Sequence, residues 1–131
     1  MKHKFLFITF LAVFLVGALH LIASAFYYYW TIIWFDNLMH FLGGFSIGLL
    51  SLWIYFSIFK NSDLTRKQTI IKSLIFVIAI GIGWEIFEYI NGITQSEESY
   101  SLDTTQDLIA DIIGAILAGD LVSRKKLYLN V

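Results

Sequence analysis

Carboxylates and one histidine recur at helical spacing inside long apolar stretches of this sequence. Six of them form three pairs, each spaced by three or four positions: Asp36 with His40, Glu85 with Glu88, and Asp107 with Asp111. In a helix, this spacing places both members of a pair on one face. Carboxylates with an imidazole suit Mg²⁺, Mn²⁺, Fe²⁺ or Zn²⁺, and bundle metal sites are assembled from such pairs on facing helices. We therefore predict a divalent metal site with these six residues as ligands.

Glu85 and Asp107 are also the candidates for a catalytic role. A carboxylate beside a metal-bound water can act as a general base, and the acids suffice for two ions that would clamp a phosphoryl group. The sequence offers no Ser-His-Asp set and no arginine near the site, although phosphate recognition commonly uses arginine. The leading hypothesis is a metal-dependent membrane hydrolase, or a binding protein, for a lipid-linked or envelope substrate.

The elements that must position these residues are membrane-spanning helices. Of 131 residues, 58% are hydrophobic and 15% charged, which is more apolar surface than a small soluble domain can bury. Four apolar stretches, 5–26, 37–59, 69–90 and 104–122, each have roughly the 20 residues that cross a bilayer as a helix. The sequence therefore predicts an all-α membrane protein, with residues 1–131 forming a single antiparallel bundle of four transmembrane helices.

The distribution of basic residues predicts the orientation of this bundle. With four spans, all nine fall on one side of the membrane: Lys2, Lys4, Lys60, Arg66, Lys67, Lys72, Arg124, Lys125 and Lys126. The positive-inside rule then places both termini in the cytoplasm, as in a multi-pass protein of a bacterial inner membrane. The loop 94–101 contains Glu97 and Glu98 but no base, so we expect it outside. A signal peptide cleaved after Ala23-Ser24-Ala25 is the alternative, and it would leave three spans.

Small residues continue the same three helix faces toward the cytoplasm. They are Gly44 and Gly48 in the second stretch, Gly81 in the third, and Gly114 and Ala118 in the fourth. Small residues let membrane helices approach closely. Packing of these faces should therefore bring the ionisable residues together in one layer of the outer half of the bilayer.

Three spaced motifs carry a resemblance to a known family. They read Asp36-x-x-x-His40-Phe-x-x-Gly44, Trp84-Glu85-x-x-Glu88, and Asp103-x-x-x-Asp107-x-x-x-Asp111-x-x-Gly114. This pattern resembles the YjdF inner-membrane family, whose function is unknown. It is more distantly similar to VanZ-like proteins, which are linked with teicoplanin resistance. Asp111 stands where those proteins have Asn, and Glu88 where they tend to have Gln, which favours the YjdF relation. The likeness covers residues 36–119 and implies an inner-membrane protein without implying a reaction.

Two other functions remain open from the sequence. A proton or divalent-cation transporter or channel subunit would need a polar route to the cytoplasm, but the stretch below the acids offers only Ser46, Ser51 and Asp120. A non-enzymatic subunit would use protonated carboxyls as hydrogen bonds between helices. The lipid bilayer is an expected partner, no nucleic acid is expected, and the sequence leaves the oligomeric state open.

Several residues near the site have two interpretations. Asp36 and Asp103 are candidates either for ligation or for capping a helix, and Asp103 with Gln106 has the spacing of a capping box. His20 could join the site or simply be hydrogen-bonded within its span. The aromatic run 26–30 suits the headgroup level of the membrane, and an aromatic lining for a lipid substrate is the alternative. Trp84 is expected to serve packing.

Overall fold

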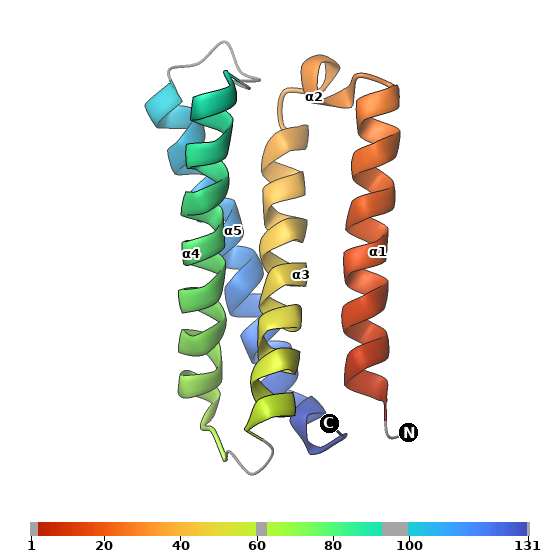
Figure 1. The fold of residues 1–131 in the computed structure, drawn as a ribbon, viewed down its shortest axis with the longest axis vertical. Coiled ribbons are helices and arrows are strands. Elements are labelled where there is room, and N and C mark those ends of the chain that lie inside the picture. Colours follow the sequence, from red (N-terminus) through yellow and green to blue (C-terminus); the bar gives the residue numbers. More distant parts are fainter. Residues whose placement is uncertain (1–2, 60–62, 93–99, 131) are drawn as a thin grey trace.

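Four long helices form an up-and-down bundle in the computed structural model, which describes residues 3–59, 63–92 and 100–130. They are α1 (Lys4–Ala25), α3 (Phe35–Ile58), α4 (Arg66–Asn91) and α5 (Tyr100–Arg124). Two short helices that were not predicted, α2 (Tyr28–Thr31) and η1 (Leu127–Asn130), follow α1 and α5. Both chain ends lie at the same end of the bundle (Figure 1). The all-helical class is confirmed, and no strand occurs within the described ranges.

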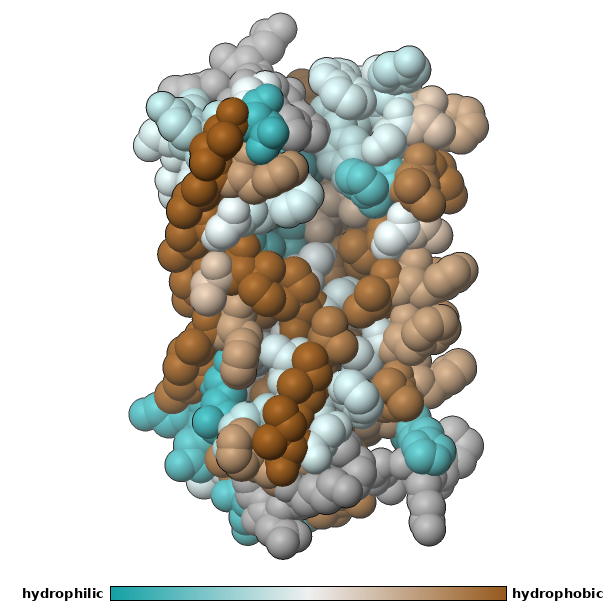
Figure 2. Space-filling model, in the orientation of Figure 1, coloured by the Kyte–Doolittle hydropathy of each residue, from teal (hydrophilic) through white to brown (hydrophobic). Residues whose placement is uncertain are grey.

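Three of the long helices are apolar enough to span a membrane. Within the described residues, α1, α3 and α4 meet the length and hydropathy expected of a span. Helix α5 has 25 residues, but it carries four aspartates and is not among these three. Apolar side chains cover the middle of the face in Figure 2, and polar ones gather toward both ends.

Of the loop 94–101 that we expected to face outward, residues 94–99 lie outside the described residues, and Tyr100 and Ser101 belong to α5. Glu97 and Glu98 are among residues 94–99. Two of the nine basic residues, Lys2 and Lys60, also lie outside the described ranges.

Local sequence determines where the helices of the site begin. Thr65 and Gln68 form a reciprocal capping box at the start of α4. The predicted start of α5 at Asp103 is wrong, because the helix begins one turn earlier at Tyr100. The hydroxyl of Tyr100 donates to the backbone carbonyl of Glu85 on α4 (2.9 Å), which anchors this additional turn. Capping by Asp36 is also wrong, since Asp36 is the second residue of α3 and not its N-cap.

The predicted close packing of small residues is confirmed between α3 and α5. A Cβ atom on Gly44 would clash with the backbone of Asp111, and one on Gly114 would clash with the carbonyl of Phe41. On α4, the Ser73 hydroxyl donates to the carbonyl of Ala115 (2.9 Å), so this helix also lies close to α5. Backbones in such contact leave no space for larger side chains, which fixes the faces that α3, α4 and α5 turn toward one another.

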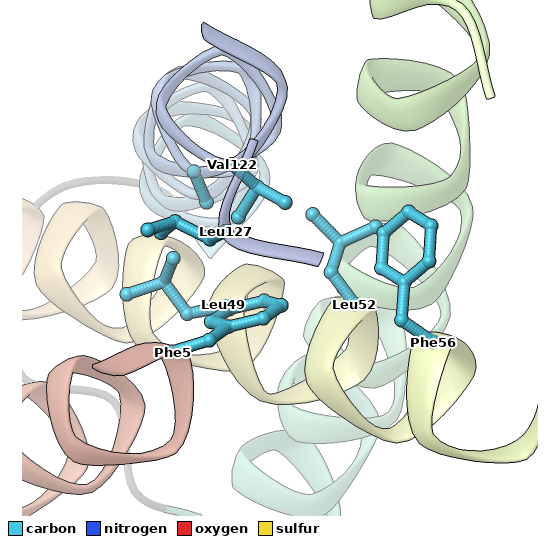
Figure 3. Packing of buried hydrophobic residues seen from close by; sticks show 7 residues of the cluster. Phe5, Leu49, Leu52, Phe56, Val122 and Leu127 are labelled. Carbon is cyan, nitrogen blue, oxygen red and sulfur yellow. The ribbon is translucent and has the colours of Figure 1, made fainter. Parts of the chain in front are cut away.

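Helix α1 is attached differently from the other three. It packs mainly along α3, whereas α5 packs against both α3 and α4. An apolar cluster near the chain ends ties α1 to the bundle; Figure 3 shows its members Phe5, Leu49, Leu52, Phe56, Val122 and Leu127. A second cluster at the opposite end contains Ala23, Tyr29, Phe35 and Met39. Among the described residues, α1 makes no extensive contact with α4.

Candidate metal and ligand site

His40 on α3 lies at the centre of the ionisable residues that the sequence singled out. Its Nε2 atom is 4.0 Å from Asp36 Oδ1, one turn earlier on the same helix, and 3.8 Å from Asp107 Oδ2 on α5. Its Nδ1 atom is 3.6 Å from Asp111 Oδ1, also on α5. The close approach of α3 and α5 at Gly44 thus brings two acids of α5 to opposite edges of one imidazole ring.

Helix α4 adds two buried carboxylates to the same layer. Atoms of His40, Glu85 and Glu88 that could bind a metal lie within 4.8 Å of one another, as do those of Asp36, His40 and Asp107. Glu85 Oε2 accepts a hydrogen bond from the Thr104 hydroxyl (2.7 Å). Its other oxygen, Oε1, is buried without a hydrogen-bond partner, and the residue is only 5% exposed. The structure therefore brings the other five predicted residues around His40.

The charge around His40 is strongly one-sided. Five carboxylic acids surround a single imidazole. The lysines and arginines that the structure describes lie toward the end of the bundle where the chain termini are, as at Lys4, Arg66 and Arg124. Asp120 lies at that end too and forms ion pairs with both Arg66 and Arg124. Buried carboxylates without a counter-charge are costly, so this layer is suited to bind cations.

A cavity of about 350 Å³ opens beside the acids, between α1, α3 and α4. Its polar lining comes from five helices: His20, Tyr29, Asp36, His40, Glu88 and Asp111. Trp84, which we expected to serve packing, also lines the cavity. Its remaining wall is mostly aliphatic and includes Val16, Ile47, Val77 and Ile80. Asp107 and Glu85 are not among the lining residues, but both lie close to His40, which is one of them.

His20 does join this region, through a residue that the sequence analysis did not single out. Its Nδ1 atom is 2.7 Å from the Tyr29 hydroxyl. Tyr27 adopts a left-handed backbone conformation (φ 59°), which starts α2 and turns Tyr29 inward to 8% exposure. Burial, and then the nearby carboxylates of Asp36 and Glu88, raise the pKa of Tyr29 to about 12. The phenol therefore stays protonated, and its hydroxyl is hydrogen-bonded to the imidazole of His20.

The aromatic run thus has two kinds of members. Phe26, Tyr27 and Trp30 are exposed, as expected of an interfacial belt, whereas Tyr29 lines the cavity. Nothing in the run itself separates Tyr29 from its neighbours, because the turn between α1 and α3 determines which ring points inward.

Thr104 and Asn37 also support the site without having been singled out. Thr104 holds Glu85, and Asn37 donates to Gln106 Oε1 (3.2 Å), which joins α3 to α5. Both could have been found from the predicted helices, since each lies within one turn of a predicted ligand. Asp103 belongs to neither group of candidate ligands.

Long apolar helices that surround a buried carboxylate–histidine cluster define a polytopic membrane protein rather than a soluble bundle. The chain belongs to the family described as "Predicted membrane protein (DUF2238)", whose match covers residues 2–126. This is the YjdF family, so that prediction is confirmed, and the match extends the likeness to the first helix. The VanZ-like relation is not shown. No curated protein and no solved structure matches the chain.

Proposed function

We propose that this protein is a cytoplasmic-membrane protein of bacterial type, with one domain of four spans and both termini inside. At 1.5 Å per residue, the 25 residues of α5 extend roughly 37 Å, enough to cross the hydrocarbon core. The packing of α5 against α3 and α4 gives its acids neighbours other than lipid. The basic residues at one end of the bundle support a cytoplasmic location for that end.

At the outer end, the site binds a divalent metal ion through His40 Nε2, Asp36 and Asp107. The single observation that carries this assignment is the arrangement of the two carboxylates at 4.0 and 3.8 Å from this nitrogen. For metal–ligand bonds of about 2.1 Å, neighbouring ligand atoms lie roughly 3–4 Å apart. One ion between the three groups would also offset the repulsion between the acids.

The remaining acids have distinct roles in this proposal. Asp111 faces the other ring nitrogen, so it orients His40 by accepting from Nδ1–H, as carboxylates commonly do behind a metal-bound histidine. This refines the expectation that Asp111 is itself a ligand. Glu85 and Glu88 complete the site, and the unpartnered Glu85 Oε1 supplies a free carboxylate oxygen. Glu85 and Asp107 remain the candidates for a general base.

The site acts on, or binds, a lipid-linked or envelope substrate from the outer leaflet. The cavity beside the acids supports this, because it joins the polar cluster to an aliphatic wall. A route for protons or cations to the cytoplasm is less well supported. Below the acids, a Cβ on Gly48 would lie 2.6 Å from Ser73 Oγ and 2.8 Å from the Ala118 side chain, so the helices touch there. A purely structural role would leave the unpartnered oxygen of Glu85 unexplained.

Elemental analysis of the purified protein after exposure to Mg²⁺, Mn²⁺, Fe²⁺ and Zn²⁺ tests the metal site. We expect about one equivalent of one divalent metal, and its loss in Glu85→Gln and Asp107→Asn. Asp120→Asn is the matched control, because Asp120 pairs with arginines at the opposite end of the bundle. Folded wild-type protein without metal under these conditions would refute the metal proposal. Retention of metal in both site variants would refute the ligand assignment.

A further inference from the structure

The cavity near His40 has a polar end and an apolar end. Asp36, Glu88 and Asp111 are among its lining residues, while Ile47 and Val77 belong to its aliphatic wall. Its volume of about 350 Å³ holds about a dozen groups of the size of a water molecule, at about 30 Å³ each. This volume fits one hydrocarbon chain together with a small head group, and it lies in the range of pockets that bind small molecules.

Two glycines keep this cavity open. A Cβ atom on Gly17 of α1 or on Gly43 of α3 would meet no other atom within 4 Å, and both residues line the cavity. Gly44, next to Gly43, is different, because its missing side chain allows the backbone of α5 to approach. Gly17 and Gly43 therefore serve no helix contact, and their small size leaves room for a ligand.

The cavity is reached from the side of the bundle. Helix α1 packs along α3 and makes no extensive contact with α4 among the described residues, yet all three helices contribute to the lining. Both helices expose apolar side chains, including Phe14 on α1 and Ile80 on α4, and Ile80 also lines the cavity. A ligand dissolved in the membrane could enter between α1 and α4 without crossing the aqueous phase.

The lining determines which head group fits the polar end. Among the residues that the structure describes, no lysine or arginine lines the cavity, and the carboxylates around His40 exceed the two positive charges of one divalent ion. Two aromatic rings, Tyr29 and Trp84, also line it. Carboxylates together with aromatic rings are the groups that recognise ammonium ions, through charge and through cation–π contact.

We propose that this cavity binds a membrane amphiphile with an ammonium head group and a single hydrocarbon chain. The head group lies among Glu88, Asp111 and the two aromatic rings, and the chain lies along the aliphatic wall past Gly17 and Gly43. This inference rests on the proposed function, since it names the chemical class of the lipid substrate for the same outward-facing site. An anionic amphiphile of equal chain length is disfavoured by the carboxylates.

Photo-crosslinking of the full chain in non-ionic dodecyl maltoside micelles tests this proposal. Two 12-carbon probes with a diazirine at the chain end are compared, one with a trimethylammonium head group and one with a sulfonate. We expect the ammonium probe to label peptides containing Val16, Ile47 or Val77 at least about tenfold more than the sulfonate probe. Equal labelling by both probes would overturn the assignment of the head group.

Cavity-filling variants provide the second arm. Gly17→Leu and Gly43→Leu should each reduce labelling by the ammonium probe about tenfold. Gly83→Leu on α4 is the matched control: a Cβ there also meets no atom within 4 Å, but Gly83 is not part of the lining, so labelling should be unchanged. Unchanged labelling in both cavity variants would overturn the location.

Metal content, measured in the same samples, separates this inference from the proposed metal site. We expect it to be unchanged in the three glycine variants. Ammonium-selective labelling without bound metal would refute the metal site and leave the amphiphile site standing. Bound metal without selective labelling would refute the amphiphile site and leave the metal site standing.

Discussion

Gly81 on α4 lies directly against the carboxylate of Asp111 on α5, so that a Cβ atom on Gly81 would come within 2.6 Å of Asp111 Oδ2. The other oxygen of the same carboxylate is 3.6 Å from His40 Nδ1. The absence of a side chain at Gly81 on α4 therefore sets the position of the Asp111 carboxylate on α5. This carboxylate in turn faces the imidazole of His40 on α3. Small residues in this protein position the ionisable groups as well as allowing helices to pack.

Gly81→Ala should weaken metal binding without removing any ionisable group. The added methyl group displaces the Asp111 carboxylate and loosens its hold on His40. Changes of this kind behind a metal ligand cost about 10–100-fold in affinity, and we expect the lower end of that range. Metal titration of the purified variant measures the effect. Gly83→Ala adds the same methyl group in open space and should bind like the wild type; equal affinities of the two variants would contradict this role of Gly81.

Gly44→Ala should destabilise the bundle, whereas Gly43→Ala should not. At Gly44 the new methyl group would clash with the Asp111 backbone, which cannot move without separating α3 from α5. Overpacking of this kind costs about 1–3 kcal/mol. At Gly43 the same change meets open space and gains the higher helix propensity of alanine. The free energies of unfolding in micelles test the difference. Equal stability of the two variants would mean that the close approach at Gly44 is not required.

Asp107→Asn should lower metal affinity more than Asp111→Asn. Asp107 faces the nitrogen of His40 assigned to the metal, and Asp111 faces the other nitrogen. Loss of an orienting carboxylate costs about 10–100-fold, and loss of a ligand should cost more. Parallel metal titrations of the two variants decide the order. The reverse order would place the ion on the Nδ1 side of the ring.

Single-cysteine labelling should show that α5 crosses the membrane. The chain contains no cysteine, so each introduced thiol reports alone. Ser101→Cys, at the start of α5, should react with a membrane-impermeant maleimide in intact cells. Lys125→Cys, just after α5, should react only once the membrane is permeabilised. Reaction of both variants in intact cells would contradict a membrane-crossing α5, because it would place both ends of this helix outside.

The sequence by itself determined the helical class, the positions of the long helices and the six ionisable residues that meet. Each of these follows from local properties, namely the length of an apolar run and the spacing of residues along one helix face. The contact between α3 and α5 could be predicted as well, because Gly44 and Gly114 lie on the same faces as the acids.

Only the tertiary structure decided how these groups are arranged. The spacing of Asp107 and Asp111 does not show that they face different nitrogens of His40, because that depends on the rotation of α5 against α3. The inward turn of Tyr29 depends on the backbone between α1 and α3. The cavity exists because α1 packs along α3 and not against α4. The periodicity of a single helix does not show which other helices it will pack against.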